Sequence, residues 1–121
     1  MYKFNIVGFL HWGYNFYNSR YSWYKINPFL VTDAAGSFVS GDSFSVYPGK
    51  DGPLMSTRLQ VFYEALTDIR ALKLLETLIP REEIVAKLDS ETEMTFADYP
   101  HSAEWLLGFR EWVNEKIAEN V

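Results

Sequence analysis

The sequence predicts an α/β fold in which two short strands and a long loop precede two long helices and one short helix. Two observations lead to this prediction. Residues 4–10 form a short apolar run rich in β-branched and aromatic side chains, and residues 43–47 alternate polar and apolar, both as in strands. Over much of residues 56–121, apolar side chains instead recur every three or four positions, as on one face of a helix. We therefore expect residues 1–121 to form a single segment with a strand–loop–strand region, 1–55, and a helical region, 56–121.

The first half of the chain contains both predicted strands. The first is the run Phe-Asn-Ile-Val-Gly-Phe-Leu at 4–10, continued by His11 and Trp12, and its lack of strict alternation favours burial on both faces. Residues 13–41 have no sustained period and are rich in Tyr, Asn, Ser and Gly, which predicts a long loop of the kind that usually carries function. Residues 43–47 alternate polar and apolar, and residues 48–53 contain Pro and Gly in a pattern typical of a turn.

The second half contains the predicted helices. Ser56 or Thr57 is a suitable N-cap, and an apolar face then runs to about residue 78. Pro80 is tolerated at the start of a short helix over 81–88, and Pro100 marks the start of a last helix. Residues 89–98 are acidic and polar, which favours a loop. The expected inner faces are Leu59, Phe62, Leu66, Ile69, Leu72 and Leu75 in the first helix, and Leu106, Phe109, Val113 and Ile117 in the last.

Composition excludes several classes of function. The chain has no Cys, which excludes disulfides, thiolate metal sites and thiol nucleophiles. Its net charge of −5 argues against a general nucleic-acid-binding surface. No apolar run approaches the roughly 18 residues of a membrane span, and residues 1–20 lack the layout of a signal peptide. The phosphate-loop and dinucleotide fingerprints are also missing, so we expect no cofactor.

The segment from Gly8 to Asn18 is the strongest candidate for a ligand site. Aromatic rings beside amide groups suit sugar recognition, because ring faces stack on CH groups while amides pair with hydroxyls. Trp12 and Tyr14 share one face of the predicted strand, and Asn15 lies on the other. The alternative is that these rings belong to the core and that the Asn side chains only satisfy loop backbone.

The sequence does not show a complete set of catalytic groups. Glycoside hydrolysis usually needs two carboxylates on a rigid frame, and nothing pairs Asp33, Asp42 or Asp51. His11 and His101 have no partner pattern of a metal site, so we expect no metal. Glu64 and Asp68 lie one turn apart and would repel each other unless a cation lay between them, for which Arg70 and Arg58 are the candidates; the alternative is a surface coincidence.

A series of motifs nevertheless resembles a known family. In order along the chain they are Gly-Phe-Leu-His-Trp-Gly-Tyr-Asn-Phe-Tyr (8–17), Ile-Asn-Pro (26–28), Ser-Gly-Asp-Ser-Phe-Ser-Val-Tyr-Pro-Gly (40–49), Asp-Gly-Pro (51–53), Ser-x-Arg-Leu-x-x-Phe-x-Glu-Ala-Leu-x-Asp (56–68), Thr-Phe-x-x-Tyr-Pro (95–100) and Ala-Glu-Trp-Leu-Leu (103–107). They cover nearly the whole chain. The sequence thus resembles domain of unknown function 4091, the C-terminal domain of bacterial proteins related to glycoside hydrolase family 123, whose members are β-N-acetylgalactosaminidase-like enzymes.

The resemblance implies the C-terminal portion of a (β/α)8 barrel. Residues 5–12 would be the penultimate barrel strand, 43–47 the last strand, 57–78 the following helix and 100–118 a terminal helix. Active sites of such barrels lie at the carboxyl ends of the strands, so the resemblance favours a substrate-binding role for Trp12, Tyr14, Asn15 and Tyr47. The family's catalytic Asp-Glu pair belongs to an earlier strand, and this chain has no Asp-Glu dipeptide.

These observations lead to a set of expectations about function. We expect a piece cut from a longer hydrolase-like protein, inactive alone, that supplies part of a wall binding an N-acetylhexosamine-containing glycan. The alternatives are an autonomous carbohydrate-binding or protein-interaction module and a purely structural cap. Uncovered strand edges and apolar helix faces predict self-association or contact with an upstream barrel portion. The compartment stays open, because an export signal would lie upstream.

Overall fold

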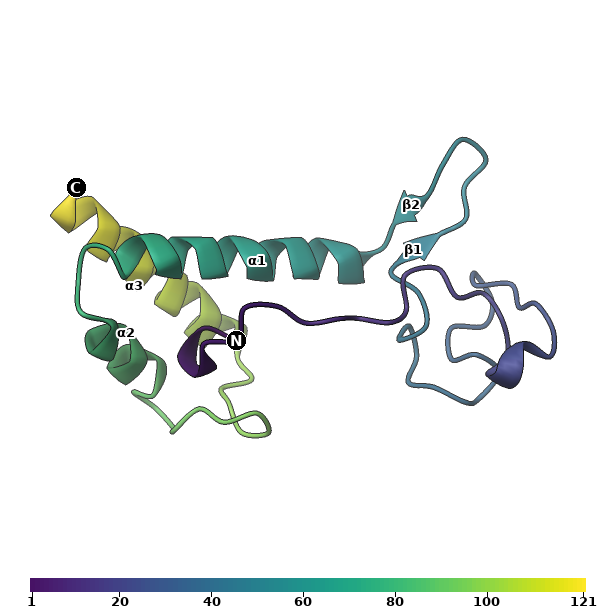
Figure 1. Ribbon diagram of the computed structural model, residues 1–121, viewed down its shortest axis with the longest axis horizontal. Coiled ribbons are helices and arrows are strands. Elements are labelled where there is room, and N and C mark those ends of the chain that lie inside the picture. Colours follow the sequence, from purple (N-terminus) through teal and green to yellow (C-terminus); the bar gives the residue numbers. More distant parts are fainter. The chain divides into compact units, whose positions relative to one another are not determined.

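The computed structural model describes residues 1–121 and is mixed α/β, with three α-helices and one two-stranded sheet. The helices are α1 (Thr57–Leu75), α2 (Arg81–Leu88) and α3 (Ala103–Asn120), and the strands are β1 (Val46–Tyr47) and β2 (Leu54–Met55) (Figure 1). Two short 3₁₀ turns, η1 (Tyr2–Phe4) and η2 (Arg20–Ser22), complete the ordered elements. None of the helices combines the length and the apolar character that crossing a membrane requires.

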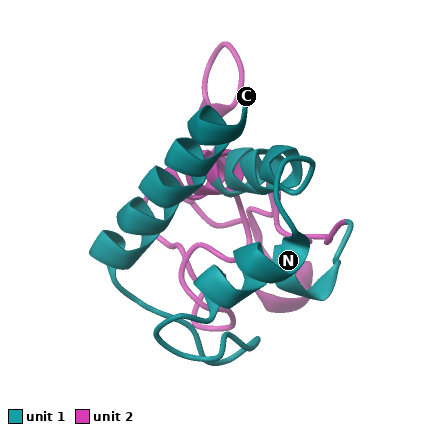
Figure 2. Cartoon of the chain, turned by 90° about the vertical axis from the view of Figure 1, so that its left-hand side faces the viewer, with its two compact units in different colours: residues 1–7, 65–121 teal, residues 8–64 magenta.

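The chain divides into two compact units, shown in different colours in Figure 2. Unit 1 comprises Met1–Val7 and Ala65–Val121, and unit 2 comprises Gly8–Glu64. Unit 1 therefore contains α2, α3 and most of α1, whereas unit 2 contains the sheet and the first turns of α1. Each unit is described separately below.

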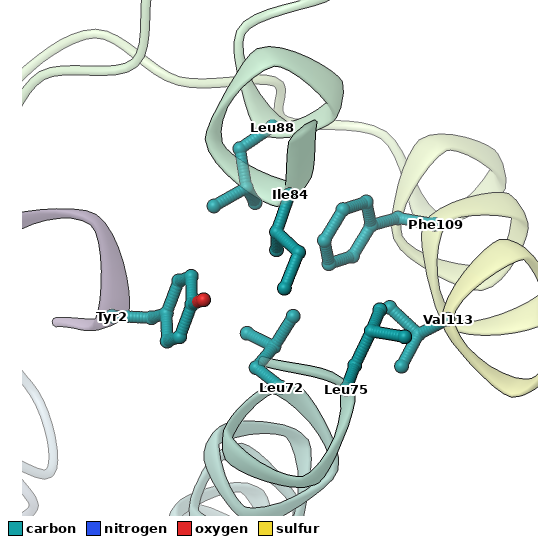
Figure 3. Packing of buried hydrophobic residues seen from close by; sticks show 7 residues of the cluster. All are labelled: Tyr2, Leu72, Leu75, Ile84, Leu88, Phe109 and Val113. Carbon is teal, nitrogen blue, oxygen red and sulfur yellow. The ribbon is translucent and has the colours of Figure 1, made fainter. Parts of the chain in front are cut away.

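Unit 1 is built around a hydrophobic core to which three helices contribute. Its buried members are Tyr2 from η1, Leu72 and Leu75 from α1, Ile84 and Leu88 from α2, and Phe109 and Val113 from α3. Figure 3 shows these side chains pointing toward one another from the four elements. Leu75 and Ile84 have no exposed surface at all. Burying side chains of this size stabilises a fold by about 1.5–3 kcal/mol each, so this core is the main reason for the helical packing.

The N-terminal turn joins this core through polar contacts as well as through Tyr2. Arg81 donates hydrogen bonds to the carbonyl oxygens of Tyr2 and Lys3, at 3.1 and 2.9 Å. The Lys3 ammonium in turn reaches Asp89 at 2.9 Å and the carbonyl of Met94 at 2.8 Å. These contacts fix residues 2–4 to α2 and to the loop that follows it.

The helices agree with the sequence predictions more closely than the strands do. The short helix has the predicted bounds, 81–88, and residues 89–98 form the predicted loop. The long helix ends at Leu75 rather than near 78, and residues 76–78 form turns after it. The last helix begins at Ala103 rather than at Pro100, because the Ser102 hydroxyl caps it by accepting from the Trp105 N–H at 2.9 Å.

The predicted apolar faces of the long helices are buried only in part. Of the face predicted for α1, only Leu72 and Leu75 are buried, and Leu66 is half exposed. In α3 the buried positions are Phe109 and Val113, while Ile117 packs at the margin of the core and Leu106 is exposed. The periodicity therefore identified the correct faces, but packing covers only the stretch of each face that another element reaches.

The predicted strand over 5–12 is wrong for this structure, where these residues form no strand. A strand needs a neighbour to satisfy its backbone, and no segment pairs with this one. Its apolar side chains are correspondingly open to solvent: Val7 is fully exposed and Leu10 is 92% exposed. An apolar run alone therefore does not make a strand when no other segment pairs with it.

The second predicted strand, 43–47, is confirmed only over Val46–Tyr47. It pairs antiparallel with Leu54–Met55, so that Val46 lies opposite Met55 and Tyr47 opposite Leu54. The predicted turn over 48–53 makes the connection between the two strands. The sheet is therefore a local antiparallel hairpin, and residues 5–12 are not part of it.

Candidate functional site

The candidate site lies in unit 2, where two segments distant in sequence run together. Phe16 donates its N–H to the Ser43 carbonyl at 3.0 Å, and the Tyr14 carbonyl accepts from Ser45 and Val46 at 2.8 and 3.2 Å. The Ser45 hydroxyl adds a bond to the Gly13 carbonyl at 3.1 Å. These hydrogen bonds bring residues 12–16 beside residues 42–47. The two segments together contain all four predicted binding residues.

Gly13 is required at the point where these segments meet. A Cβ at this position would overlap the backbone of Asp42 and Ser43. Because backbone cannot yield as a flexible side chain does, any larger residue would separate the two segments. The Gly between Trp12 and Tyr14 therefore has a packing reason in this structure.

Trp12 is held from two sides and still leaves 48% of its surface exposed. Its indole N–H donates to Asp42 Oδ2 at 2.9 Å. Its ring lies 5.0 Å from Phe38 and 5.4 Å from Phe16, between centroids, in tilted and edge-on geometries. A fixed, half-exposed indole is the kind of surface on which a sugar ring stacks.

Tyr47 belongs to a second aromatic group in the same unit. Its ring stacks on Phe29 with centroids 5.1 Å apart, and it meets the fully buried Phe44 edge-on at 5.1 Å. Tyr17 also packs against Phe44, at 5.7 Å, and its hydroxyl donates to the Val46 carbonyl at 2.8 Å. Burial raises the pKa of Tyr17, which favours the neutral phenol that this hydrogen bond requires.

The remaining two predicted residues lie on the same strip of chain. Tyr14 is 51% exposed, and its main chain, rather than its ring, makes the contacts to β1. Asn15 is exposed and pairs through its backbone with Phe44. The structure thus brings Trp12, Tyr14, Asn15 and Tyr47 into one unit, where the first three are exposed and Tyr47 is partly buried.

Two contributors were missed in sequence analysis. Asp42 was considered only as a carboxylate for catalysis, whereas here it holds the Trp12 indole. Arg58 was considered only as a countercharge, whereas its guanidinium donates to the Phe44 carbonyl from Nε at 3.1 Å and from Nη2 at 2.8 Å. No sequence signal identifies such partners, because each contact joins residues that only the fold brings together.

The predicted cation for the Glu64–Asp68 pair was also wrong. Arg110 of α3, and neither Arg70 nor Arg58, forms a two-pronged ion pair with Asp68, at 2.7 Å for both hydrogen bonds. Glu64 instead accepts from Gln60 at 3.4 Å. The spacing revealed that a countercharge was needed, but the helix that supplies it could not be read from spacing.

The two histidines have ordinary aromatic surroundings. His11 packs against Phe62, with ring centroids 5.3 Å apart, and His101 is exposed and packs against Tyr99 at 4.3 Å. No group of three or more His, Asp or Glu side chains is arranged to hold a metal ion. The groups that the site presents are aromatic rings, amide and hydroxyl groups and the Asp42 carboxylate.

Comparison with known proteins identifies the family. The family model described as "Glycoside hydrolase 123, catalytic domain" matches residues 1–75, which is more than half of the chain and includes all of unit 2. No curated protein matches the chain. On the strength of the family match, the chain belongs to glycoside hydrolase family 123.

Proposed function

We propose that this chain supplies part of the carbohydrate-binding wall of a glycoside hydrolase and contributes no catalytic group. The half-exposed Trp12, held by Asp42, Phe16 and Phe38, is the observation that carries the proposal. Trp12 stacks on a sugar ring, while Tyr14, Asn15 and Tyr47 bind its hydroxyl or acetamido groups. The family match supports a carbohydrate as the ligand.

The position of the chain within a larger domain is a further part of the proposal. We infer that residues 1–121 form one C-terminal segment of the domain of unknown function 4091 type, which closes a (β/α)8 barrel. Under this proposal residues 5–12 become a strand when a neighbouring barrel strand pairs with them. The exposed apolar side chains of Val7 and Leu10 support this, because pairing in a barrel would bury them. The catalytic Asp-Glu pair then lies on another strand of the barrel.

Sugar binding is tested by titrating the chain with N-acetylgalactosamine and N-acetylglucosamine while following the indole N–H signals by NMR. We expect the Trp12 signal to shift, and Trp12→Ala to weaken binding about tenfold, the equivalent of about 1.4 kcal/mol for one ring contact. Trp23→Ala is the matched control, because Trp23 is also an exposed Trp of unit 2. Its ring packs against that of Tyr21, outside the candidate site. Wild-type affinity in Trp12→Ala would remove Trp12 from the site.

The absence of catalysis has its own test. We expect the isolated chain to cleave an aryl N-acetylhexosaminide no faster than buffer does, because the chain has no Asp-Glu dipeptide of the kind that the family uses for catalysis. Cleavage above that rate would overturn this part of the proposal. Sugar binding together with a monomeric chain would favour the autonomous module, and a chain with no response to sugar would favour the structural cap.

Self-association is the expected behaviour of the chain in isolation. Many large apolar side chains are exposed, among them Leu10, Leu30, Val39 and Met55, each at least 73% exposed. Surfaces of this kind normally mark a contact with another chain or another part of the same protein. Sedimentation should show concentration-dependent dimers or larger species, and a monomer over the whole concentration range would contradict this expectation.

A further inference from the structure

Arg58 occupies a position that neither the family match nor the proposed sugar contacts explain. It lies in the first turn of α1, half buried, and its guanidinium points back onto the segment that precedes β1. Two of its nitrogens bond the same acceptor, the Phe44 carbonyl. A two-donor contact to one oxygen fixes the plane of the guanidinium as well as its position.

The same guanidinium lies over both rings of the second aromatic group. Its central carbon is 5.1 Å from the centroid of Phe44 and 5.8 Å from that of Tyr47. Such contacts are attractive because the positive charge faces the electron-rich rings. Arg58 therefore contacts Tyr47 directly and also holds the buried ring against which Tyr47 packs.

A third contact links Arg58 to the Trp12 side of the site. A Cβ at Gly41 would lie 2.7 Å from Nη1 and 2.8 Å from Cζ of Arg58, so the guanidinium packs directly on the Gly41 backbone. The next residue, Asp42, accepts the hydrogen bond of the Trp12 indole. One side chain thus contacts Tyr47 itself and the backbone that carries the acceptor for Trp12.

We propose that Arg58 is the positioning residue of the candidate site. Arg58 holds Tyr47 directly, and it holds Trp12 through Gly41–Asp42, so that both side chains keep the arrangement that receives the ligand. The identity of that ligand rests on the proposed function, whereas the positioning itself does not. Arg58 does not touch the sugar in this proposal. Its effect on binding is exerted through the two aromatic side chains.

The direct test replaces Arg58 by Lys, which keeps the charge but loses the planar donor pair and the ring contacts. We expect the Trp12 indole N–H signal to shift in Arg58→Lys without sugar, and sugar affinity to fall about tenfold. The control is Arg20→Lys in the same unit. The Arg20 guanidinium also lies over a ring, that of the exposed Tyr21 at 4.7 Å, but it contacts none of the site residues.

A second pair of variants leaves Arg58 in place, which keeps the proposal testable if Arg58→Lys fails to fold. Gly41→Ala displaces the guanidinium, whereas Gly36→Ala has nothing within 4 Å of the new Cβ. The backbone strain is matched, because φ is +83° at Gly41 and +80° at Gly36. We expect Gly41→Ala to shift the Trp12 signal and weaken binding, and Gly36→Ala to do neither.

The outcomes separate this inference from the proposed function. If Arg58→Lys and Gly41→Ala both leave the Trp12 signal and sugar affinity at wild-type values, Arg58 is not a positioning residue, and the proposed function stands. If the wild-type chain does not bind sugar but both variants shift the Trp12 signal, the proposed ligand is wrong and the positioning role holds. If the signals of Trp105 and Trp112 in unit 1 shift equally in both variants, the effect is a general loss of structure and the inference fails.

Discussion

The two units of this chain are stabilised by different means. Unit 1 buries seven apolar or aromatic side chains in one cluster contributed by three helices and η1. Unit 2 has little regular structure, and it is held by backbone bonds between residues 14–16 and 43–46, by ring contacts and by Arg58. It also leaves Trp12, Tyr14 and Trp23 about half or more exposed. The aromatic side chains in the core of unit 1, Tyr2 and Phe109, are buried, whereas Trp12 and Tyr14 of unit 2 remain accessible to a ligand, and the candidate site therefore lies in unit 2.

The largest effect should come from opening the core of unit 1. Leu75→Ala removes a side chain with no exposed surface, and we expect it to lower the free energy of unfolding of unit 1 by about 2–5 kcal/mol. Leu74→Ala is the matched control, because Leu74 is the adjacent residue and is 51% exposed. Its effect should stay within about 0.5 kcal/mol. Urea denaturation followed by circular dichroism measures both.

The same variant tests whether the units are as different as their contacts suggest. The chain has two Trp side chains in each unit, so indole N–H signals report on both. In Leu75→Ala, we expect the folded-state signals of Trp105 and Trp112 to be lost at urea concentrations at which the folded-state signals of Trp12 and Trp23 persist. Simultaneous loss of all four signals would show that the two units unfold as one.

A smaller effect is expected from the helix caps, and here unit 2 should be the more sensitive. The Ser56 hydroxyl is buried, accepts from the Leu59 N–H at 3.2 Å and donates to the Ser45 carbonyl at 2.6 Å. Ser56→Ala removes both bonds, and we expect a loss of about 2 kcal/mol. Ser102→Ala removes one exposed cap bond and should cost about 1 kcal/mol or less. Equal losses in thermal unfolding would argue against the special role of Ser56.

The ion pair between Asp68 and Arg110 should contribute less to stability than the Ser56 cap does. Its geometry is two-pronged, but both side chains are 31% exposed, so solvent screens much of the attraction. A double-mutant cycle with Asp68→Asn and Arg110→Met, which removes the charge of each partner in turn, should give a coupling energy of about 0.5–1 kcal/mol in unit 1. The coupling should weaken in 1 M salt, and a salt-independent value would mean that packing rather than charge links the two residues.

The smallest effect is a pH dependence of unit 1. Hydrogen bonding to Lys3 and to the Met94 backbone lowers the pKa of Asp89, and hydrogen bonding to Lys73 lowers the pKa of Glu76. Because both pKa values lie below those of the unfolded chain, the stabilisation is present above the ordinary values of 3.8 and 4.5 and is lost as pH falls through the lowered ones. Melting temperature should drop on acidification below about pH 4.5. Asp89→Asn should flatten the drop, and an unchanged slope would exclude Asp89 as a source.

The sequence allowed better prediction of the helices than of the strands, for a physical reason. The bounds of α2 follow from local signals such as Pro80, and the cap of α1 is Ser56, one of the two candidates that residue type allowed. The strand expected over 5–12 depends on a neighbour, and a run of apolar residues does not say whether a neighbour is present. The hairpin escaped prediction because Leu54–Met55 is only two residues long and exposed.

The candidate site shows the same division between local and distant information. Trp12, Tyr14, Asn15 and Tyr47 could be selected from residue type and position, and the structure gathers them in one unit. The residues that hold this site could not be selected in the same way, because Asp42 is 30 positions from Trp12 and Arg58 is 14 positions from Phe44. Residue type suggests what can bind a sugar, whereas the supporting contacts depend on tertiary structure.

The attachment of the N-terminal turn has a consequence for the order of folding. The contacts that hold residues 2 and 3 to α2 and its following loop join positions 78 to 91 apart in the sequence. Such distant contacts form only after a long stretch of chain has been closed into a loop, which slows them relative to helix formation. Residues 1–7 are therefore expected to dock last, on helices that have already assembled.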